Sequence, residues 1–352
     1  MAKGMDRRTA IKGMALGGVA AALGWSGIPV AFAAQGRVVV GTWGGDYGQL
    51  LAKNIETPLL KPQGIEVVQD QASDAPRRSK LMAEKRLPRG TSDVQALTAG
   101  NMYEMNQNDV LLKLDYSKLP NAASLMPIMK YPYGVGQIYS GMVIVLNPAD
   151  FPKKPASFKD LFDPAHGSKH GVIDIQYQFM LTAASMAATN GASMTDYDKG
   201  KELLMAVKKA GARVYPSNEA FAQALKSGEI SIGMMWKART VQWQNAGIAC
   251  EGIVASEGIP IYMSGFAIPK NAPNKEGAYA YLNASMDKSA QRAFAIDMGY
   301  NPTITGVDVP ADVQKRIGFT PDEEKRLMDL PYAELAKNDA ALKEWWDKVF
   351  KG

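Results

Sequence analysis

The sequence predicts an α/β protein with two domains, and three observations lead to that prediction. Short apolar segments alternate with amphipathic segments along most of the 352 residues, which is typical of strands connected by helices. The apolar segments of the first part of the chain are continuous rather than alternating, which indicates a parallel sheet there that is covered on both faces. About 318 residues remain after an amino-terminal leader, and that length exceeds what one hydrophobic core usually supports.

The first half of the chain opens with a βαβαβ pattern. Its elements are expected as strand 37–41, helix 46–55, strand 65–68, helix 75–86, strand 93–97 and helix 102–108. A longer β-rich run follows at 137–147, with Ser140 and Gly141 in its middle. A strand of that length suits a crossing between two domains, so we expect it to connect them.

A second α/β set begins beyond this strand. It comprises strand 172–175, helices 178–190 and 196–210, strand 213–215, helix 218–227 and strand 230–236. Ser217 fits the N-cap of the helix 218–227, because its hydroxyl can accept a hydrogen bond from the first turn. The remaining elements are strand 261–268, helices 274–286 and 288–298, the segment 321–330 and an amphipathic helix 335–350.

The first 34 residues have the pattern of an export leader. Arg7 and Arg8 precede a weakly apolar segment, and small residues lie before a cut at the junction of Ala33 and Ala34. Adjacent arginines in this position are of the twin-arginine type, which exports folded cargo. The alternative is an amino-terminal membrane anchor, but glycines and a proline interrupt the apolar segment. We therefore expect the mature protein to work in the periplasm.

Charge and composition describe an ordinary soluble protein once the leader is set aside. The leader has a net charge of +3, so the +5 of the whole chain leaves about +2 for the rest. This balance, with 46% hydrophobic residues, argues against nucleic acid or an acidic membrane as the obligate partner. No apolar run after Ala34 approaches about 18 residues without charges, so we expect no transmembrane helix there.

Cysteine and histidine are scarce, and we expect no metal or other cofactor. Cys250 is the single cysteine, so no intramolecular disulfide can form. His166 and His170 have a spacing that could grip zinc on a helix, but neighbouring glycines and Pro164 indicate a turn. We therefore expect two surface histidines in that turn.

Several short motifs follow one another in a characteristic order. They are Gly41-Thr42-Trp43-Gly44-Gly45-Asp46-Tyr47, Ser157-Phe158-Lys159-Asp160-Leu161-Phe162-Asp163-Pro164, Met235-Trp236-Lys237-Ala238-Arg239, Ser256-Glu257-Gly258, the run 266–278 and Gly299-Tyr300-Asn301-Pro302. In this order, behind an export leader, they resemble the extracellular solute-binding proteins of ABC importers, specifically the spermidine/putrescine-binding type. The resemblance covers residues 37–310.

This resemblance implies a type II periplasmic-binding fold, in which crossover strands join two α/β lobes and the ligand lies between them. We place lobe one at 35–140 plus 265–309 and lobe two at 141–264 plus 310–352. The implied activity is capture of a small-molecule ligand for the membrane permease of an ABC importer, by a monomer that makes and breaks no bond.

Aromatic side chains near strand ends are the main candidates for ligand contact. Ligands of open α/β sheets lie beyond the carboxyl ends of the strands, where Trp43, Trp236 and Tyr262 are expected. Each ring offers apolar contact and attracts a cation, although a single aromatic is more often part of a core. The expected ligand-binding set is completed by Asp46, Tyr47, Asp174, Tyr177, Arg239, Ser264 and Tyr300.

Ligand class is predicted from two of these positions. Relatives that bind polyamines place an acidic residue where Ser264 stands, and Asp174 has no second carboxylate beside it, whereas a polyamine needs paired carboxylates. Arg239 matches an arginine of relatives that bind amino acids such as 4-aminobutyrate, and a guanidinium suits a carboxylate; the alternative is a solvated surface arginine. We expect a carboxylate-bearing or zwitterionic solute, with Asp174 or Asp46 taking an amine; a polyamine is the alternative.

Two other functions are weighed against binding. Thiaminase-type enzymes share the implied fold and use a cysteine nucleophile, for which Cys250 is the one candidate, but neither histidine lies near it in sequence. Ferric iron capture in distant relatives uses tyrosine pairs, whereas Tyr131 and Tyr133 are separated by a proline. We therefore expect a binding protein.

Overall fold

The structure is a computed structural model, and it describes residues 36–352. The predicted leader and its cleavage position lie outside the described residues. Among the residues that are described, no helix is long and apolar enough to cross a membrane.

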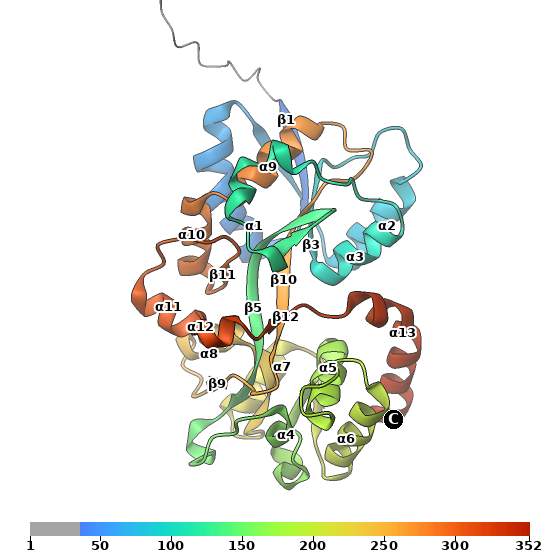
Figure 1. The fold of residues 1–352 in the computed structure, drawn as a ribbon, viewed down its shortest axis with the longest axis vertical. Helices are drawn as coiled ribbons and strands as arrows, with labels where there is room; N and C mark the ends of the chain where they lie inside the picture. The colour runs from blue at the N-terminus through green and yellow to red at the C-terminus, as the bar shows by residue number, and fades with distance from the viewer. Residues whose placement is uncertain (1–35) are drawn as a thin grey trace, which may run out of the picture. The chain divides into compact units, whose positions relative to one another are not determined.

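A mixed sheet organises the fold (Figure 1). The strand β1 (Arg37–Thr42) lies between β2 (Glu66–Gln71) and β3 (Val94–Thr98), and both pairings are parallel. The next strand, β10 (Ile259–Ala267), pairs antiparallel with β3 and with β5 (Gly134–Leu146). The parallel sheet expected for the βαβαβ opening is therefore confirmed over β1, β2 and β3, whereas the antiparallel direction of β10 and β5 was not predicted. Burial on both faces does not distinguish parallel from antiparallel strands here, because every residue of β5 is buried although its neighbours run antiparallel.

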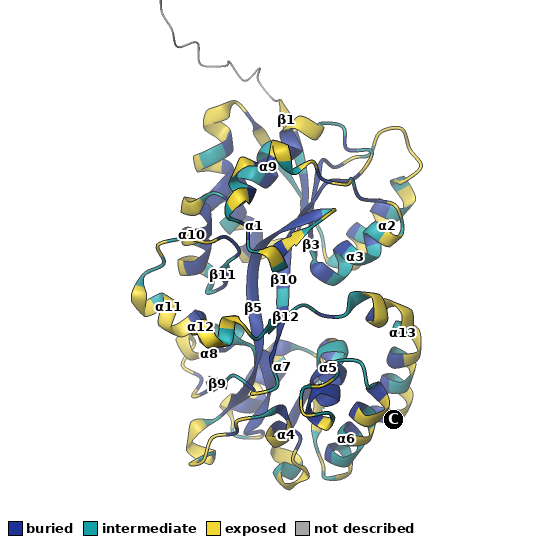
Figure 2. Cartoon of the chain, in the orientation of Figure 1, coloured by how far each residue is buried: buried dark blue, intermediate teal, exposed yellow. Residues whose placement is uncertain are grey.

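The strand β5 passes from one part of the fold to the other, as its length predicted. Its first part pairs with β10 up to Gly141, and the part from Met142 to Leu146 pairs with β8 (Ile232–Trp236) and β9 (Glu251–Ile253). Figure 2 shows both long strands buried over most of their length. At Gly141 a Cβ atom would lie 2.3 Å from Ile259 Cγ2, so the crossing needs a glycine.

The helices around β1, β2 and β3 cover the first part of the sheet. They are α1 (Gly45–Leu51), which continues as a π-helix over Ala52–Leu60, α2 (Asp74–Glu84), α3 (Ala99–Gln107), α9 (Lys275–Ser285) and α10 (Lys288–Met298). Their buried apolar faces and the strands form one large core, which we call the first core. The predicted helices occur here, with the first extending to Leu60 rather than ending at residue 55.

A second core lies at the other end of β5. The elements around it are α4 (Phe158–Leu161), β6 (Gly171–Ile173), α5 (Tyr177–Ala188), α6 (Tyr197–Lys209) and α13 (Tyr332–Trp345), with a π-helical end over Trp346–Phe350. Beside them, β7 (Arg213–Tyr215), α7 (Asn218–Lys226) and α8 (Lys237–Asn245) supply side chains to smaller clusters. Met142, Leu181 and Trp346 are among the fully buried members of the second core. Ser217 caps α7 as predicted, because its hydroxyl accepts from Ala220 N at 3.1 Å.

The segment that leads to α13 is more broken than expected. It contains α11 (Ala311–Ile317), α12 (Pro321–Glu324) and β12 (Leu327–Met328), which pairs with the start of β10. Two further short strands, β4 (Lys130–Tyr131) and β11 (Asn301–Pro302), pair with β5. The boundaries of the two predicted lobes remain a prediction.

The two histidines differ in burial, which corrects the expectation that both are on the surface. His166 is half-buried, whereas His170 is buried against Phe162 with their ring centroids 5.9 Å apart. Neither ring nitrogen of His170 has a hydrogen-bond partner in the described chain. Burial therefore lowers the pKa of His170 to about 3.

Candidate functional site

A cavity of about 830 Å³ opens where the first and second cores meet. Side chains from the loop after β1, from α2, α3 and α13, from the start of α5 and from the strands β8 and β10 line it. Four of the ten predicted ligand-binding residues are among its lining residues: Trp43, Tyr177, Trp236 and Tyr262. The sequence missed the other polar members, which are Asp74, Arg78, Thr98, Asn101, Tyr103, Glu104, Gln176, Gln178, Tyr332 and Asp339.

Aromatic rings form much of the wall. Trp236 and Tyr262 have ring centroids 4.6 Å apart, and Phe179 lies edge-on to Trp236 at 6.4 Å. Trp43 follows the end of β1 and Trp236 ends β8, as predicted. Tyr262 lies inside β10 and not near its end, because this strand begins at Ile259 and runs on to Ala267.

Three predicted residues lie behind this aromatic wall. Tyr47 is edge-on to Trp43 at 5.4 Å and donates to Gln137 Oε1 at 3.0 Å, and Tyr300 is 6.0 Å from Tyr262. Ser264 is buried on β10. Burial raises the pKa of Tyr47, Tyr262 and Tyr300, so these phenols are neutral at physiological pH. They support the wall without adding charge to it.

The remaining three predicted residues do not line the cavity. Asp46 is exposed on α1. Asp174 accepts from Trp346 Nε1 at 2.7 Å and pairs with Lys351 at 2.9 Å, so it fixes the carboxyl-terminal turn. Arg239 is half-buried on α8, close enough to Tyr300 that its charge offsets part of the rise that burial causes in the pKa of that phenol. Ligand contact by these three residues remains a prediction.

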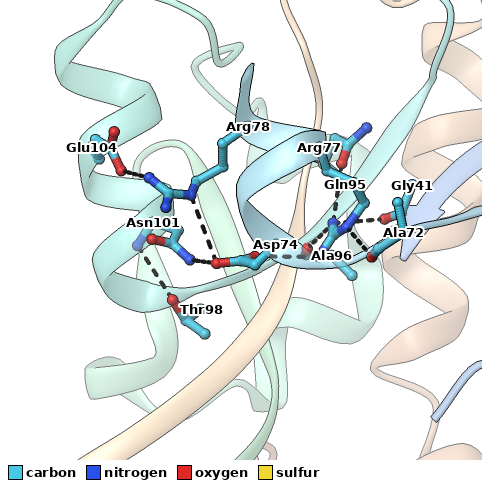
Figure 3. A network of polar contacts seen from close by, with 10 residues as sticks. All are labelled: Gly41, Ala72, Asp74, Arg77, Arg78, Gln95, Ala96, Thr98, Asn101 and Glu104. Atoms are coloured by element: carbon cyan, nitrogen blue, oxygen red, sulfur yellow. Dashed lines mark hydrogen bonds and ion pairs between the residues drawn. The ribbon is translucent and has the colours of Figure 1, made fainter. Parts of the chain in front are cut away.

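A polar network on α2 and α3 forms one wall (Figure 3). Its anchor is Arg77, which is buried and donates to Ala96 O at 2.6 Å, to Ala72 O at 3.1 Å and to Asp74 Oδ1 at 3.3 Å. The guanidinium also lies 4.7 Å from the ring centroid of Trp43. Burial lowers the pKa of Arg77, and Asp74 offsets part of that change. Arg77 therefore holds both Asp74 and the Trp43 ring in place.

Arg78 is the cationic side chain among the described residues that line the cavity. It bonds Glu104, and its Nε lies 3.7 Å from Asp74 Oδ2, which also accepts from Asn101. Ala99 and Gly100, the first residues of α3, line the cavity beside it. The free N–H groups at a helix start favour a negatively charged group. This wall can therefore hold an anionic group, through Arg78 and α3 together.

The opposite wall carries a carboxylate that no cation neutralises. Asp339 of α13 accepts from Gln178 Nε2 at 2.7 Å and from the Tyr177 hydroxyl, and both bonds end on Oδ1. Tyr332, at the start of α13, stacks on Tyr103 of α3 at 6.3 Å. The sequence predicted α13 only as an amphipathic helix, and nothing in its pattern separates Asp339 from a solvated acid.

Residues with metal-binding or nucleophilic chemistry lie elsewhere. Within residues 36–352 no group of three or more histidine, cysteine, aspartate or glutamate side chains is placed to hold a metal ion. Cys250 is buried in a small cluster with Phe221 and Trp243, and burial raises the pKa of its thiol to about 11. Neither Cys250 nor either histidine lines the cavity.

The chain is similar to known binding proteins over most of its length. The family model described as bacterial extracellular solute-binding protein matches residues 57–321. The spermidine/putrescine-binding periplasmic protein of Escherichia coli (strain K12) is 26% identical over 255 residues, which cover 70% of this chain and 70% of that protein. Spermidine/putrescine-binding periplasmic protein 1 of Haemophilus influenzae is 24% identical over 329 residues, which cover 90% of this chain and 86% of that protein.

Solved structures show the same fold at lower identity. An ABC transporter substrate-binding protein from Bradyrhizobium japonicum USDA 110 superposes with a TM-score of 0.77 at 23% identity, covering 90% of this chain and 100% of that chain. The Atu4243 GABA receptor superposes with a TM-score of 0.76 at 21% identity, covering 90% of this chain and 98% of that chain. The predicted α/β fold of the two-lobed binding-protein type is therefore confirmed.

Proposed function

The chain belongs to the bacterial extracellular solute-binding proteins, and on that premise we propose that it captures a small organic solute in the cavity and delivers it to the permease of an ABC importer. The observation that carries the proposal is the cavity itself. Its volume of about 830 Å³ is in the range of small-molecule sites, and its wall combines aromatic rings with a few charged groups.

We favour a zwitterionic solute. Arg78 and the start of α3 offer one place for a carboxylate, since a guanidinium and free N–H groups both favour an anion. Arg78 takes over the role that the sequence assigned to Arg239, which does not line the cavity. The lining holds the carboxylates Asp74, Glu104 and Asp339 against that single guanidinium. This excess of negative charge disfavours a solute that carries only carboxylates.

A polyamine is the second candidate, and the same charge excess favours it. Relatives at 24 to 26% identity are named for spermidine and putrescine. Against it, Asp74 and Glu104 are already engaged by Arg78, and Ser264 replaces the acidic residue of the polyamine type. A diamine would therefore meet one free carboxylate rather than a pair, and burying its second charge unpaired would cost several kcal/mol.

The solute would be captured when the parts of the fold around the first and second cores close on it, and released when they open again. The chain passes between the cores through β5, near 255–259, and along the segment that ends at Leu330. A solute that touches Trp43 on one side and Trp236 on the other would stabilise the closed form. The permease would read that closed surface.

Binding without catalysis suits the positions of the reactive side chains. A thiaminase-type reaction would need Cys250 as a thiolate in the cavity, whereas this thiol is buried outside it with a raised pKa. For ferric iron, Tyr131 is unsuited because it donates to Asp329 at 2.8 Å and stacks on Tyr133. Turnover that disappears in Cys250→Ser, or visible absorbance that depends on iron, would contradict this part of the proposal.

A periplasmic location completes the proposal. The relatives named above are periplasmic proteins, and the leader with Arg7 and Arg8 supplies a route of export. We expect a monomer whose mature chain begins near Ala34. Amino-terminal sequencing of the protein recovered from the periplasm checks the location and the start of the mature chain. Light scattering checks that the protein is a monomer.

A thermal-shift screen tests the central proposal. The purified mature chain is melted with amino acids, amines and carboxylates, because a solute that binds only the folded form raises the melting temperature. When the concentration of free solute is about 100 times its dissociation constant, the expected gain in the free energy of unfolding is about 2.7 kcal/mol. A library of such solutes in which none moves the melting temperature would contradict capture of a small solute.

A further inference from the structure

We propose that Asp339 is the residue that recognises a protonated amino group of the solute, and that the carboxyl-terminal helix α13 thereby sets the class of ligand. The inference rests on the proposed function, because it assigns one group of the solute to one wall of the same cavity. It predicts a requirement that the aromatic wall alone would not impose.

The geometry leaves one oxygen of Asp339 for a ligand. Gln178 Nε2 and the Tyr177 hydroxyl both donate to Oδ1, which fixes the carboxylate against the start of α5. No donor among residues 36–352 bonds Oδ2. Asp339 is half-buried in the cavity lining, so this oxygen belongs to a carboxylate that is held rigidly and is partly shielded from water.

Its charge is also uncompensated, which separates it from the other carboxylates of the lining. Asp74 pairs with Arg77 and Arg78, and Glu104 pairs with Arg78. In the described chain no lysine, arginine or histidine lies within ion-pair distance of Asp339. Lys343, one turn further along α13, is engaged by Asp347 at 2.5 Å. The unpaired negative charge of the cavity is therefore concentrated at Asp339.

A protonated amine fits this position better than any other group. It supplies the cation that the carboxylate lacks and N–H donors for Oδ2, and charge-assisted hydrogen bonds of this kind are strong. Trp236 lines the same cavity, and its ring face attracts a cation as well, whereas the Tyr177 ring already has the Lys343 ammonium over it at 5.6 Å. A neutral solute would leave the charge of Asp339 unpaired, and an anionic solute would be repelled by it.

Three proteins test the inference: the wild type, Asp339→Asn and the control Glu334→Gln. Asparagine keeps an oxygen for Tyr177 and Gln178 and removes the charge. Glu334 also lies on α13 but is exposed and does not line the cavity, so the control loses the same charge elsewhere. The solutes are pairs that differ by an amino group, 4-aminobutyrate with butyrate and phenylalanine with 3-phenylpropanoate, together with putrescine, spermidine and a wider solute library.

We expect only amine-bearing solutes to raise the melting temperature of the wild type. For the best binder, titration calorimetry should show a dissociation constant about 10 to 100 times higher in Asp339→Asn and unchanged within about twofold in Glu334→Gln. The comparison within solute pairs uses the wild type alone, so it holds even where a variant folds poorly.

Two results would overturn the inference and leave the proposed function intact. One is a solute without an amine that binds the wild type as tightly as its amino partner. The other is an Asp339→Asn protein that binds the amine as tightly as the wild type. A library in which no solute binds the wild type would instead overturn the proposed function, and the inference with it.

Discussion

Trp236 bears on both the stability of the protein and the binding of its proposed ligand, because its side chain packs against neighbouring rings and also lines the cavity. Its ring contacts Tyr262 and Phe179 and lines the cavity. The sequence alone predicts that Trp236→Ala and Arg239→Ala both abolish stabilisation by the ligand. The structure separates the two residues, since only Trp236 lines the cavity.

We expect Trp236→Ala to abolish the rise in melting temperature that a bound solute causes, while the protein still folds. The ring is half-buried, so its loss should cost less than the roughly 3–5 kcal/mol of a fully buried tryptophan. Arg239→Ala should reduce the ligand response less, because its effect must pass through Tyr300. Thermal shift and circular dichroism on both variants measure this. An undiminished rise in melting temperature in Trp236→Ala would contradict a ligand site at this cavity wall.

His170 is expected to make the protein sensitive to acid. In the unfolded chain a histidine binds a proton near pH 6.5, whereas the buried ring does so only near pH 3. As the pH falls below 6.5, the unfolded state alone gains the proton, so the free energy of unfolding decreases. Between pH 7 and pH 5 this contribution should amount to about 2 kcal/mol.

Urea unfolding of His170→Leu at both pH values checks this expectation. The variant should lose about 2 kcal/mol less than the wild type between pH 7 and pH 5. His166→Gln is the control, because that neighbouring ring is only half-buried. Equal acid sensitivity in the wild type and His170→Leu would show that the buried ring does not carry the effect.

At the scale of elements, the register shift between β10 and β5 depends on a glycine. The register between β10 and β5 shifts between Ser264 and Gly265. A Cβ atom on Gly265 would lie 1.9 Å from Val135 O, which is backbone and cannot move aside. We expect Gly265→Ala to destabilise the fold by about 3 kcal/mol or more.

Gly100→Ala is the matched control for this substitution. Gly100 lies within α3, and a Cβ there would meet Tyr332 at an ordinary contact distance of 3.6 Å. The same change should therefore stabilise the protein slightly, by about 0.5–1 kcal/mol from helix propensity. Denaturant unfolding of both variants measures the contrast. A Gly265→Ala protein as stable as the wild type would mean that β5 and β10 can separate at this point.

Elements were easier to predict from the sequence than the contacts among them. Periodicity placed the helix at 196–210 and the strand at 137–147 nearly where α6 and β5 occur. Strand direction was not predicted beyond β3, because an apolar run looks the same in a parallel and in an antiparallel sheet. Helix interiors hid the rest of the site: Arg77 and Arg78 look alike in sequence, yet one is buried and one lines the cavity.

The aromatic part of the cavity lining was predictable because Trp43 directly follows β1 and Trp236 is the last residue of β8. Asp339 was not, since its partners Tyr177 and Gln178 lie about 160 residues earlier in the chain. Asp174 is the opposite case, and its contact with a ligand remains a prediction. It follows a strand as a ligand residue would, but the carboxyl-terminal turn comes back to it and takes both of its oxygens.

For the whole molecule, we expect a saturating solute to make the protein more compact. The cavity takes its lining from elements of both cores, so a solute that fills it favours an arrangement in which both walls touch it. Small-angle scattering with and without the best solute of the screen should show a smaller radius of gyration with it. Trp236→Ala under the same conditions should show no change. Scattering curves that coincide for the saturated and the free wild type would contradict closure.

The place of β10 in the middle of the sheet has a consequence for synthesis on the ribosome. This strand starts at Ile259 and joins β3, which ends at Thr98, to β5, which ends at Leu146. Until more than 260 residues have left the exit tunnel, those two strands keep open edges that can pair with other chains. The nascent protein therefore exposes these two edges for most of its translation, and although β1, β2 and β3 can pair with one another early, the sheet is completed late.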